Sequence, residues 1–476
     1  ILGTNSIKDT GYDVANSCMF DSASSQHFKW NSSPAGNRKK FTFSVWLKRS
    51  SLGTSMIASS SFSSSDEGYF FFDSNDKLTW QTSSTGMGDL KTNRAFKDLS
   101  AWYHIVLSVD TTQSTSTSRM RLYINGSEYT WDGNTTQPDQ DKQIYWNVGG
   151  TYYPYIGRRH DGNYFDGYMA EIVHIDDQQL DANNFGEFDE DSSIWKPKDV
   201  SGLTFGGNTS YYLDFEDSSS LGNDVSGNNN DFTANNLSAT NQRTDTCTNN
   251  YATMNALLPT HSSDFRNGNV EWRTTTASHY YWANSTVGLS SGKWYVEVKL
   301  QTAAAHNYFG ISVDQPDDSS TFLAGGGGEG GRNDQYEWAW KSSDGKIYNN
   351  TDSGTAYGST YTTGDILGMY LDLDNNKLYF AKNGTIQNSG TGISITAPAS
   401  LPNGFYFIAV GDGTSSNSVI WEVNFGNPSY GVSSANTDPE GYGKFEYSPN
   451  DGGSASFDSS AKDFFAINTK NLAEYG

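Results

Sequence analysis

Residues 41–48 read Phe-Thr-Phe-Ser-Val-Trp-Leu-Lys, in which the apolar residues Phe41, Phe43, Val45 and Leu47 occupy every second position. This period of two is typical of a β-strand with one buried face, and residues 102–110 (WYHIVLSVD) have a similar strand-like composition. No stretch keeps a 3.6-residue apolar period over the length of a normal helix. The sequence therefore predicts an all-β fold.

Strand-like runs of similar length recur in both halves of the chain, separated by residues that favour turns. In the first half they are 41–48, 68–73, 77–81, 102–110, 119–124 and 167–175. In the second half they are 293–300, 308–314, 336–340, 366–373, 377–381, 405–410 and 419–425. Short strands at this spacing predict two antiparallel β-sandwiches.

Composition excludes several classes of protein. The 476 residues are poor in charge, but 14% are aromatic, which is more than disordered chains contain. The net charge of −23 predicts repulsion from nucleic acid and from anionic membranes, and no apolar run approaches the length of a membrane span. Cys18 and Cys247 cannot build a disulfide framework. Because the chain begins at Ile1 rather than at Met, we expect a processed product or part of a longer one.

Changes in pattern along the chain predict four segments. We expect a first sandwich over 1–185, a polar connector over 186–254, a second sandwich over 255–428 and a Gly/Ser-rich C-terminal extension over 429–476. The connector is expected because 222–250 consists almost entirely of polar turn-forming residues.

The second half resembles a SPRY domain. The motifs that carry this resemblance, in the order of that family, are 292–298 (GKWYVEV), 309–312 (FGIS), 364–368 (GDILG), 371–374 (LDLD), 378–380 (LYF), 382–384 (KNG) and 424–426 (NFG). The first half resembles a laminin-G or concanavalin-A-like lectin domain, a jelly-roll sandwich. Its motifs are 41–48, 102–104 (WYH), 122–126 (LYING) and 165–171 (FDGYMAE).

The order of these parts resembles that of virion-associated proteins of marine tailed phages. The segments that support this resemblance are 194–198 (IWKPK), 211–215 (YYLDF), 221–228 (LGNDVSGN), 245–250 (DTCTNN) and 466–472 (AINTKNL). The resemblance implies a tail fibre or capsid appendage on the exterior of the virion, with no catalytic residues. It also implies a homo-oligomer, most simply a trimer, that binds other virion proteins or host surface polysaccharide.

Aromatic and charged side chains gather in predicted loops, and sugar-binding surfaces combine these residue types. We expect glycan or partner binding by Trp131, Tyr152, Tyr153, Tyr155, Arg158, Arg159 and Tyr164 in the first half, and by Tyr336 in the second. The alternative is that these side chains pack against a neighbouring subunit or domain, because Tyr, Trp and Arg are also favoured at protein interfaces.

Carboxylates raise two further hypotheses. Residues 187–191 (EFDED) carry alternating acids, the pattern of a retaining glycan hydrolase. Glu190 breaks the alternation and Gly186 precedes the run, which favours an acidic solvated connector instead. No cofactor is predicted, although Asp and Asn clusters leave calcium open. The candidates are Asp372 with Asp374, Asn375 and Asn376; Asp176 with Asp177; and Asp217 with Asn223 and Asp224. A hairpin turn is the simplest interpretation of 374–377, which lie between two predicted strands.

Two other functions compete with adhesion: a purely structural capsid decoration or self-assembling fibre, and a glycan-cleaving depolymerase. For the second half we expect protein binding through the loop 325–336. His104 lies inside a predicted strand, which favours a structural role.

Overall fold

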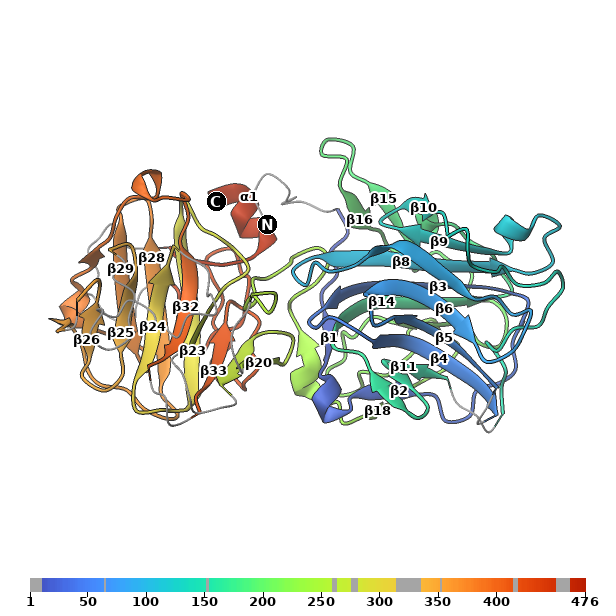
Figure 1. The fold of residues 1–476 in the computed structure, drawn as a ribbon, viewed down its shortest axis with the longest axis horizontal. Coiled ribbons are helices and arrows are strands. Elements are labelled where there is room, and N and C mark those ends of the chain that lie inside the picture. The colour runs from blue at the N-terminus through green and yellow to red at the C-terminus, as the bar shows by residue number, and fades with distance from the viewer. Residues whose placement is uncertain are drawn as a thin grey trace. The chain divides into compact units, whose positions relative to one another are not determined.

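The computed structural model describes residues 11–63, 66–150, 154–258, 263–274, 281–313, 335–351, 353–413, 418–450 and 463–476. The chain forms two compact units, residues 9–248 and residues 249–476. Both consist almost entirely of antiparallel strands (Figure 1), which confirms the all-β prediction.

Two sheets form the first unit. One contains, in spatial order, β10 (Ser127–Tyr129), β9 (Met120–Ile124), β8 (Trp102–Asp110), β3 (Lys40–Arg49), β14 (Gly167–Asp176), β1 (Ser17–Phe20) and β19 (Gln242–Arg243), with β17 (Tyr211–Leu213) paired to β14. The other contains β18 (Thr233–Asn235), β2 (His27–Lys29), β11 (Tyr155–Ile156), β4 (Ser55–Ser63), β5 (Asp66–Phe72), β6 (Lys77–Thr82) and β7 (Leu90–Ala95).

The core of this unit lies between the two sheets. The ring of Phe43 on β3 meets the ring of Phe70 on β5 edge-on, with centroids 6.4 Å apart. Phe43, Val45 and Leu47 alternate along β3 on this inner face, as the sequence pattern predicts. The residues between them are also buried, because Trp46 belongs to a second apolar cluster on the outer face.

Segments after residue 180 cover that outer face. Trp195, Val200 and Tyr212 pack there against Trp46 and Tyr168. Residues 186–248, expected as a connector, therefore belong to the first unit, and β17, β18 and β19 within them pair with β14, β2 and β1.

Carboxylates order this polar segment. The Asp224 side chain accepts hydrogen bonds from the backbone N–H groups of Tyr212 (2.9 Å), Ser226 (2.9 Å) and Asn230 (2.8 Å). The Lys48 ammonium contacts Asp245 at 2.8 Å where both side chains are buried. These polar contacts add to the packing of scattered apolar residues such as Trp195 and Tyr212, which form no apolar period in the sequence.

The second unit is also a sandwich. Its larger sheet contains β20 (Ser263–Arg266), β21 (Glu271–Thr274), β33 (Ile420–Asn424), β23 (Lys293–Thr302), β28 (Ile366–Asp372), β29 (Lys377–Lys382) and β30 (Thr385–Ile386), with β31 (Ile393–Ser394) paired to β29 and β34 (Phe465–Ala466) paired to β23. The smaller contains β22 (Tyr281–Asn284), β32 (Phe407–Asp412), β24 (Asn307–Ser312), β25 (Trp338–Lys341), β26 (Lys346–Tyr348) and β27 (Thr355–Ala356). Trp294, Trp340 and Trp421 are fully buried in its core.

The C-terminal segment packs onto this second sandwich. β34 pairs in parallel with β23, and Phe445, Phe464 and Ala466 are buried against tyrosines of the larger sheet. A short helix, α1 (Thr469–Tyr475), follows, and the Asn468 side chain caps it by accepting from the backbone N–H of Asn471. Among the described residues, no helix has the length and apolar character that crossing a membrane requires.

Short 3₁₀ turns connect several strands. They lie at Ser22–Ser24, Ser116–Ser118, Ala182–Asn184, Ala239–Asn241, Asn388–Gly390 and Pro398–Ser400.

Candidate functional site

A small hairpin lies next to β4 in the first unit. It consists of β12 (Arg158–Arg159) and β13 (Gly162–Tyr164), and Arg158 pairs with Tyr164 across it. The chain turns out of β11 at Gly157, whose φ of +77° favours glycine and where an added Cβ would lie 3.0 Å from the ring of Phe20. The Ser59 hydroxyl on β4 donates to the Arg158 carbonyl at 2.9 Å, which fixes the hairpin to the sheet.

Arg158 lies between two tyrosines. Its guanidinium carbon is 5.3 Å from the ring centroid of Tyr155 and 5.4 Å from that of Tyr164, within the range of cation–π attraction. Its Nε donates to the Arg159 carbonyl (3.0 Å) and its Nη2 to the His160 carbonyl (3.0 Å). These contacts hold the planar head between the rings.

His27 on β2 completes the support of Arg158. Arg158 Nη1 lies 3.1 Å from His27 Nε2, and His27 Nδ1 lies 2.9 Å from the Ser25 carbonyl. Because a guanidinium only donates, Nε2 accepts and the imidazole proton is on Nδ1. Burial, with the nearby charges of Arg158 and Lys29, lowers the pKa of His27, which favours this neutral form.

The second arginine of the hairpin has acidic partners. Arg159 Nη2 donates to the Tyr69 hydroxyl at 2.8 Å and lies 3.4 Å from Glu67 Oε2, while its Nε lies 3.3 Å from Asp161. Glu67 on β5 is 2% exposed and also contacts the Tyr69 hydroxyl and the His160 ring. Burial raises the pKa of Glu67 to about 7, despite the opposing effect of Arg159.

We call His27, Tyr155, Arg158, Arg159 and Tyr164 the hairpin platform. Four of these residues were predicted from the sequence, and the structure brings them together. His27, with Glu67 and Tyr69 beneath the platform, was missed. The only local indication of these buried polar residues is that Glu67 and Tyr69 alternate along a strand that continues into Phe70, Phe71 and Phe72.

The remaining predicted residues lie elsewhere or outside the described residues. Tyr152 and Tyr153 are not described. Trp131 is 8% exposed, and its indole N–H donates to the Met120 carbonyl at 2.8 Å. Tyr336, in the second unit, is half-buried against the apolar core.

Trp131 lines a separate hollow of about 540 Å³ between β7, β9 and β10. Leu90, Met120 and Tyr129 also line it, and its rim carries the ion pair of Arg121 with Glu128 at 3.2 Å. Its volume suits a small ligand.

The acidic run 187–191 lies in another hairpin, formed by β15 (Gly186–Phe188) and β16 (Trp195–Pro197). Asp189 accepts from the backbone N–H and the hydroxyl of Ser192, and Lys196 contacts it at 3.2 Å. These hydrogen bonds lower the pKa of Asp189 to about 2. An ionised, hydrogen-bonded carboxylate suits a loop better than a general acid.

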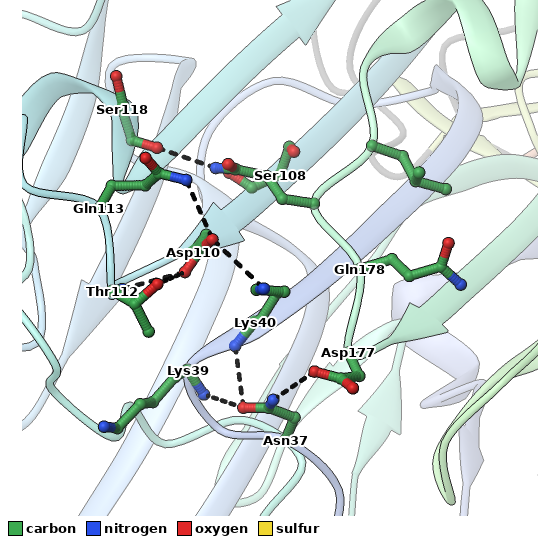
Figure 2. A network of polar contacts seen from close by, with 12 residues as sticks. Asn37, Lys39, Lys40, Ser108, Asp110, Thr112, Gln113, Ser118, Asp177 and Gln178 are labelled. Atoms are coloured by element: carbon green, nitrogen blue, oxygen red, sulfur yellow. Dashed lines mark hydrogen bonds and ion pairs between the residues drawn. The ribbon is translucent and has the colours of Figure 1, made fainter.

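Carboxylates considered as calcium ligands accept hydrogen bonds from backbone N–H groups instead. Asp176 accepts from the backbone N–H groups of Asn37 (2.8 Å) and Asn208 (2.9 Å), and Asp372 accepts from that of Asn375 (2.9 Å). Asp177 joins a polar network with Asn37, which links to Lys40 and thence to Asp110 (Figure 2). Within the described residues, no group of three or more His, Cys, Asp or Glu side chains is arranged to hold a metal ion.

Two family models match the chain. Residues 22–182 match the concanavalin A-like lectin/glucanases superfamily, and residues 293–428 match the SPRY domain. The chain carries a concanavalin A-like domain followed by a SPRY domain. This confirms the domain order that the motifs predicted.

Curated relatives match over short segments. Ran-binding protein 9 of Danio rerio is 28% identical over 102 residues, which is 21% of this chain and 16% of that protein. The ATP-dependent RNA helicase DDX1 of Xenopus laevis is 26% identical over 132 residues, which is 27% of this chain and 15% of that protein. The chain therefore spans only a small part of the relatives that it matches.

Two solved structures are similar to parts of this chain. The SPRY domain of human HERC1 is 14% identical and covers 36% of this chain and 96% of that chain, with a TM-score of 0.28. A heptameric SAP-like pentraxin of Limulus polyphemus is 17% identical and covers 36% of this chain and 79% of that chain, with a TM-score of 0.27.

Proposed function

We propose that this chain is a non-enzymatic adhesive protein whose first unit binds a saccharide through the hairpin platform. The observation that carries the proposal is the gathering of Tyr155, Arg158 and Tyr164 on one partly exposed patch. Aromatic faces take up the C–H faces of a sugar ring, and a held guanidinium supplies directed N–H donors. The concanavalin A-like fold of this unit is consistent with that role.

We place this protein on the exterior of a tailed-phage virion, as a tail fibre or capsid appendage that binds host surface polysaccharide or another virion protein. The support is the resemblance of the module order stated above. Repetition by symmetry, most simply as a trimer, would let one weak saccharide site gain avidity. A purely structural role in a capsid decoration or fibre is the competing proposal.

For the second unit we propose protein binding. The support is the SPRY match, together with the aromatic residue Tyr336 beside the glycine-rich loop. Most of the loop 325–336 lies outside the described residues, so its part in binding stays a prediction from the sequence. Deleting 325–334 and measuring attachment and assembly would test it.

The saccharide proposal is tested by binding of the full chain to a panel of immobilised bacterial surface polysaccharides. We expect saturable binding to at least one member, and a loss of at least tenfold in affinity on Tyr164→Ala. Tyr164 is half-buried and its ring contacts Arg158 and His27, so truncation removes an aromatic surface and one of the two rings that flank Arg158.

Tyr129→Ala is the matched control, because Tyr129 is another partly buried tyrosine of the same unit and lines the Trp131 hollow. Its variant should bind as the wild type does. A loss confined to Tyr129→Ala would move the saccharide site to the hollow. Absence of binding to every polysaccharide, by correctly folded protein, would favour the structural role.

A further inference from the structure

The arginines of the first unit differ in their partners. Arg49 contacts Asp76 at 3.0 Å, Arg121 contacts Glu128 at 3.2 Å, and Arg159 contacts Glu67 and Asp161. Arg158, like Arg119, has no carboxylate within ion-pairing distance among the described residues, and its guanidinium lies over the rings of Tyr155 and Tyr164. In a chain with 54 acidic and 31 basic residues, this cation is nevertheless held in place by neutral groups alone.

Two N–H groups of Arg158 have no acceptor among the described residues. A guanidinium carries five N–H groups. Three of them are used, by the carbonyls of Arg159 and His160 and by His27 Nε2. One N–H remains on each terminal nitrogen, and a pair of N–H groups is the number that binds a carboxylate in bidentate fashion.

A second cation lies on the same face. Lys29 is the cross-strand partner of Tyr155 in β2 and β11, so both side chains leave the sheet on one side. His27 and Lys29 occupy alternate positions of β2 and therefore lie on the same face, and Arg158 Nη1 is 3.1 Å from His27 Nε2. The platform is therefore locally cationic on a strongly acidic protein.

We propose that the hairpin platform recognises a carboxylate-bearing saccharide, of the uronic acid class. The two free N–H groups of Arg158 receive the carboxylate, and the flanking rings of Tyr155 and Tyr164 contact the C–H faces of the sugar. The inference rests on the proposed saccharide-binding function and specifies its ligand.

The test measures binding of the full chain to polygalacturonate and to the same polymer after reduction of its carboxyl groups, in 0.15 M salt with EDTA. At this ionic strength charges farther apart than about 8 Å are largely screened, so the acidic remainder of the protein does not mask the local site. We expect binding to the polyuronate at least tenfold tighter than to the reduced polymer.

Variants assign this preference to Arg158. Arg158→Gln should remove the preference for the polyuronate, while Arg158→Lys, which keeps the charge but loses the bidentate geometry, should retain part of it. Arg38→Gln is the matched control, because Arg38 also contacts one tyrosine ring and donates to backbone carbonyls of the same unit. Arg38→Gln should leave the preference unchanged, and thermal unfolding should show that all three variants are folded.

Other outcomes overturn the inference in distinguishable ways. Equal binding of both polymers, lowered equally by Tyr164→Ala, would keep the saccharide site and refute its acidic specificity. Equal binding of a sulfated galactan would show recognition of anionic sugars in general, and equal binding of poly-glutamate would show a site for acidic peptides. Loss of binding in EDTA alone would replace arginine recognition by a cation bridge. Binding to a neutral polysaccharide of the panel but to none of these polymers would refute only the acidic specificity, and binding to no polysaccharide at all would refute the proposed function itself.

Discussion

His104 is fully buried on β8, between the indole rings of Trp46 and Trp195, whose centroids lie 4.7 and 5.9 Å from the imidazole. The Trp195 N–H donates to Nδ1 at 3.0 Å, so the proton lies on Nε2, which donates to the Ser44 hydroxyl at 2.9 Å. Burial without a charged partner lowers the pKa of His104 to about 3. The residue is structural, as its place in a strand predicted.

This neutral histidine makes the first unit sensitive to acid. Its native pKa lies below the ordinary 6.5, so between pH 6.5 and 3 the unfolded chain binds a proton that the folded chain does not. Its contribution to stability is therefore complete above pH 6.5 and decreases as the pH falls, by about 2 kcal/mol at pH 5. Glu67 and Glu171, whose pKa values are raised to about 7, act in the opposite direction.

One variant distinguishes the pH effect of His104 from the pH effects of Glu67 and Glu171. His104→Gln retains one donor and one acceptor but does not titrate. In denaturant unfolding at pH 7.5 and pH 5, the stability difference between wild type and His104→Gln should shrink by about 2 kcal/mol on acidification. The same difference at both pH values would contradict the assigned neutral, buried state.

At the scale of elements, one carboxylate fastens the segment 427–450 to β23. Glu297 is fully buried and accepts hydrogen bonds from the backbone N–H groups of Glu446 (2.9 Å) and Tyr447 (2.7 Å) and from the Tyr295 hydroxyl (2.9 Å). Asn424 and Tyr430 add two longer contacts at 3.3 Å. Burial raises the pKa of Glu297 to about 7, although these donors favour the ionised form.

Glu297→Gln should loosen this segment. The amide places an N–H₂ group opposite donors, so at least two of them lose their acceptor, at a cost of about 2–4 kcal/mol to the second unit. Hydrogen exchange within 427–450 should accelerate more than exchange in β28. Glu440→Gln is the control, because Glu440 is an exposed acid of the same segment. Equal protection in wild type and Glu297→Gln would show that apolar packing alone holds the segment.

Elements with an apolar period were predictable, and elements ordered by polar contacts were not. The runs 41–48, 102–110 and 366–373 correspond to β3, β8 and β28 within about a residue at most ends. β17 and β18 are three-residue strands in a polar stretch of sequence, and Asp224, which looks like a turn residue in a sequence, accepts from the backbone N–H of Tyr212 on β17. The hairpin platform was predictable for its members between 155 and 164, which lie close together in the sequence, whereas His27 comes from a strand more than a hundred residues away.

At the scale of the whole molecule, each unit has its own core, and the division at Thr248 and Asn249 lies far from the boundary at 185 that the sequence pattern predicted. The reason is the outer face of the larger sheet in the first unit. Trp46, Trp102 and Tyr168 on that face are large and apolar, and much of their cover, including Trp195, Val200 and Tyr212, follows residue 185.

The buried side chain of Lys48 allows the dependence of the first unit on residues 186–248 to be tested with two fragments. In residues 9–248, Asp245 pairs with Lys48 and also accepts from the Trp102 indole N–H at 3.0 Å. Residues 9–185 lack Asp245, Trp195 and β17, so Lys48 loses its partner and the apolar face is exposed to water. Removing one partner of a buried ion pair costs about 3–5 kcal/mol by itself, a large share of the stability of a domain.

We therefore expect residues 9–248 to be soluble and to unfold in a single cooperative transition, and residues 9–185 to aggregate or to unfold without one. Asp245→Asn in the longer fragment is the intermediate case. It keeps an acceptor for Trp102 but removes the charge opposite Lys48, so its transition should move to lower denaturant with an unchanged slope. Cooperative unfolding of 9–185 at the stability of 9–248 would mean that the polar segment is a connector after all, because its packing would then contribute nothing to the fold.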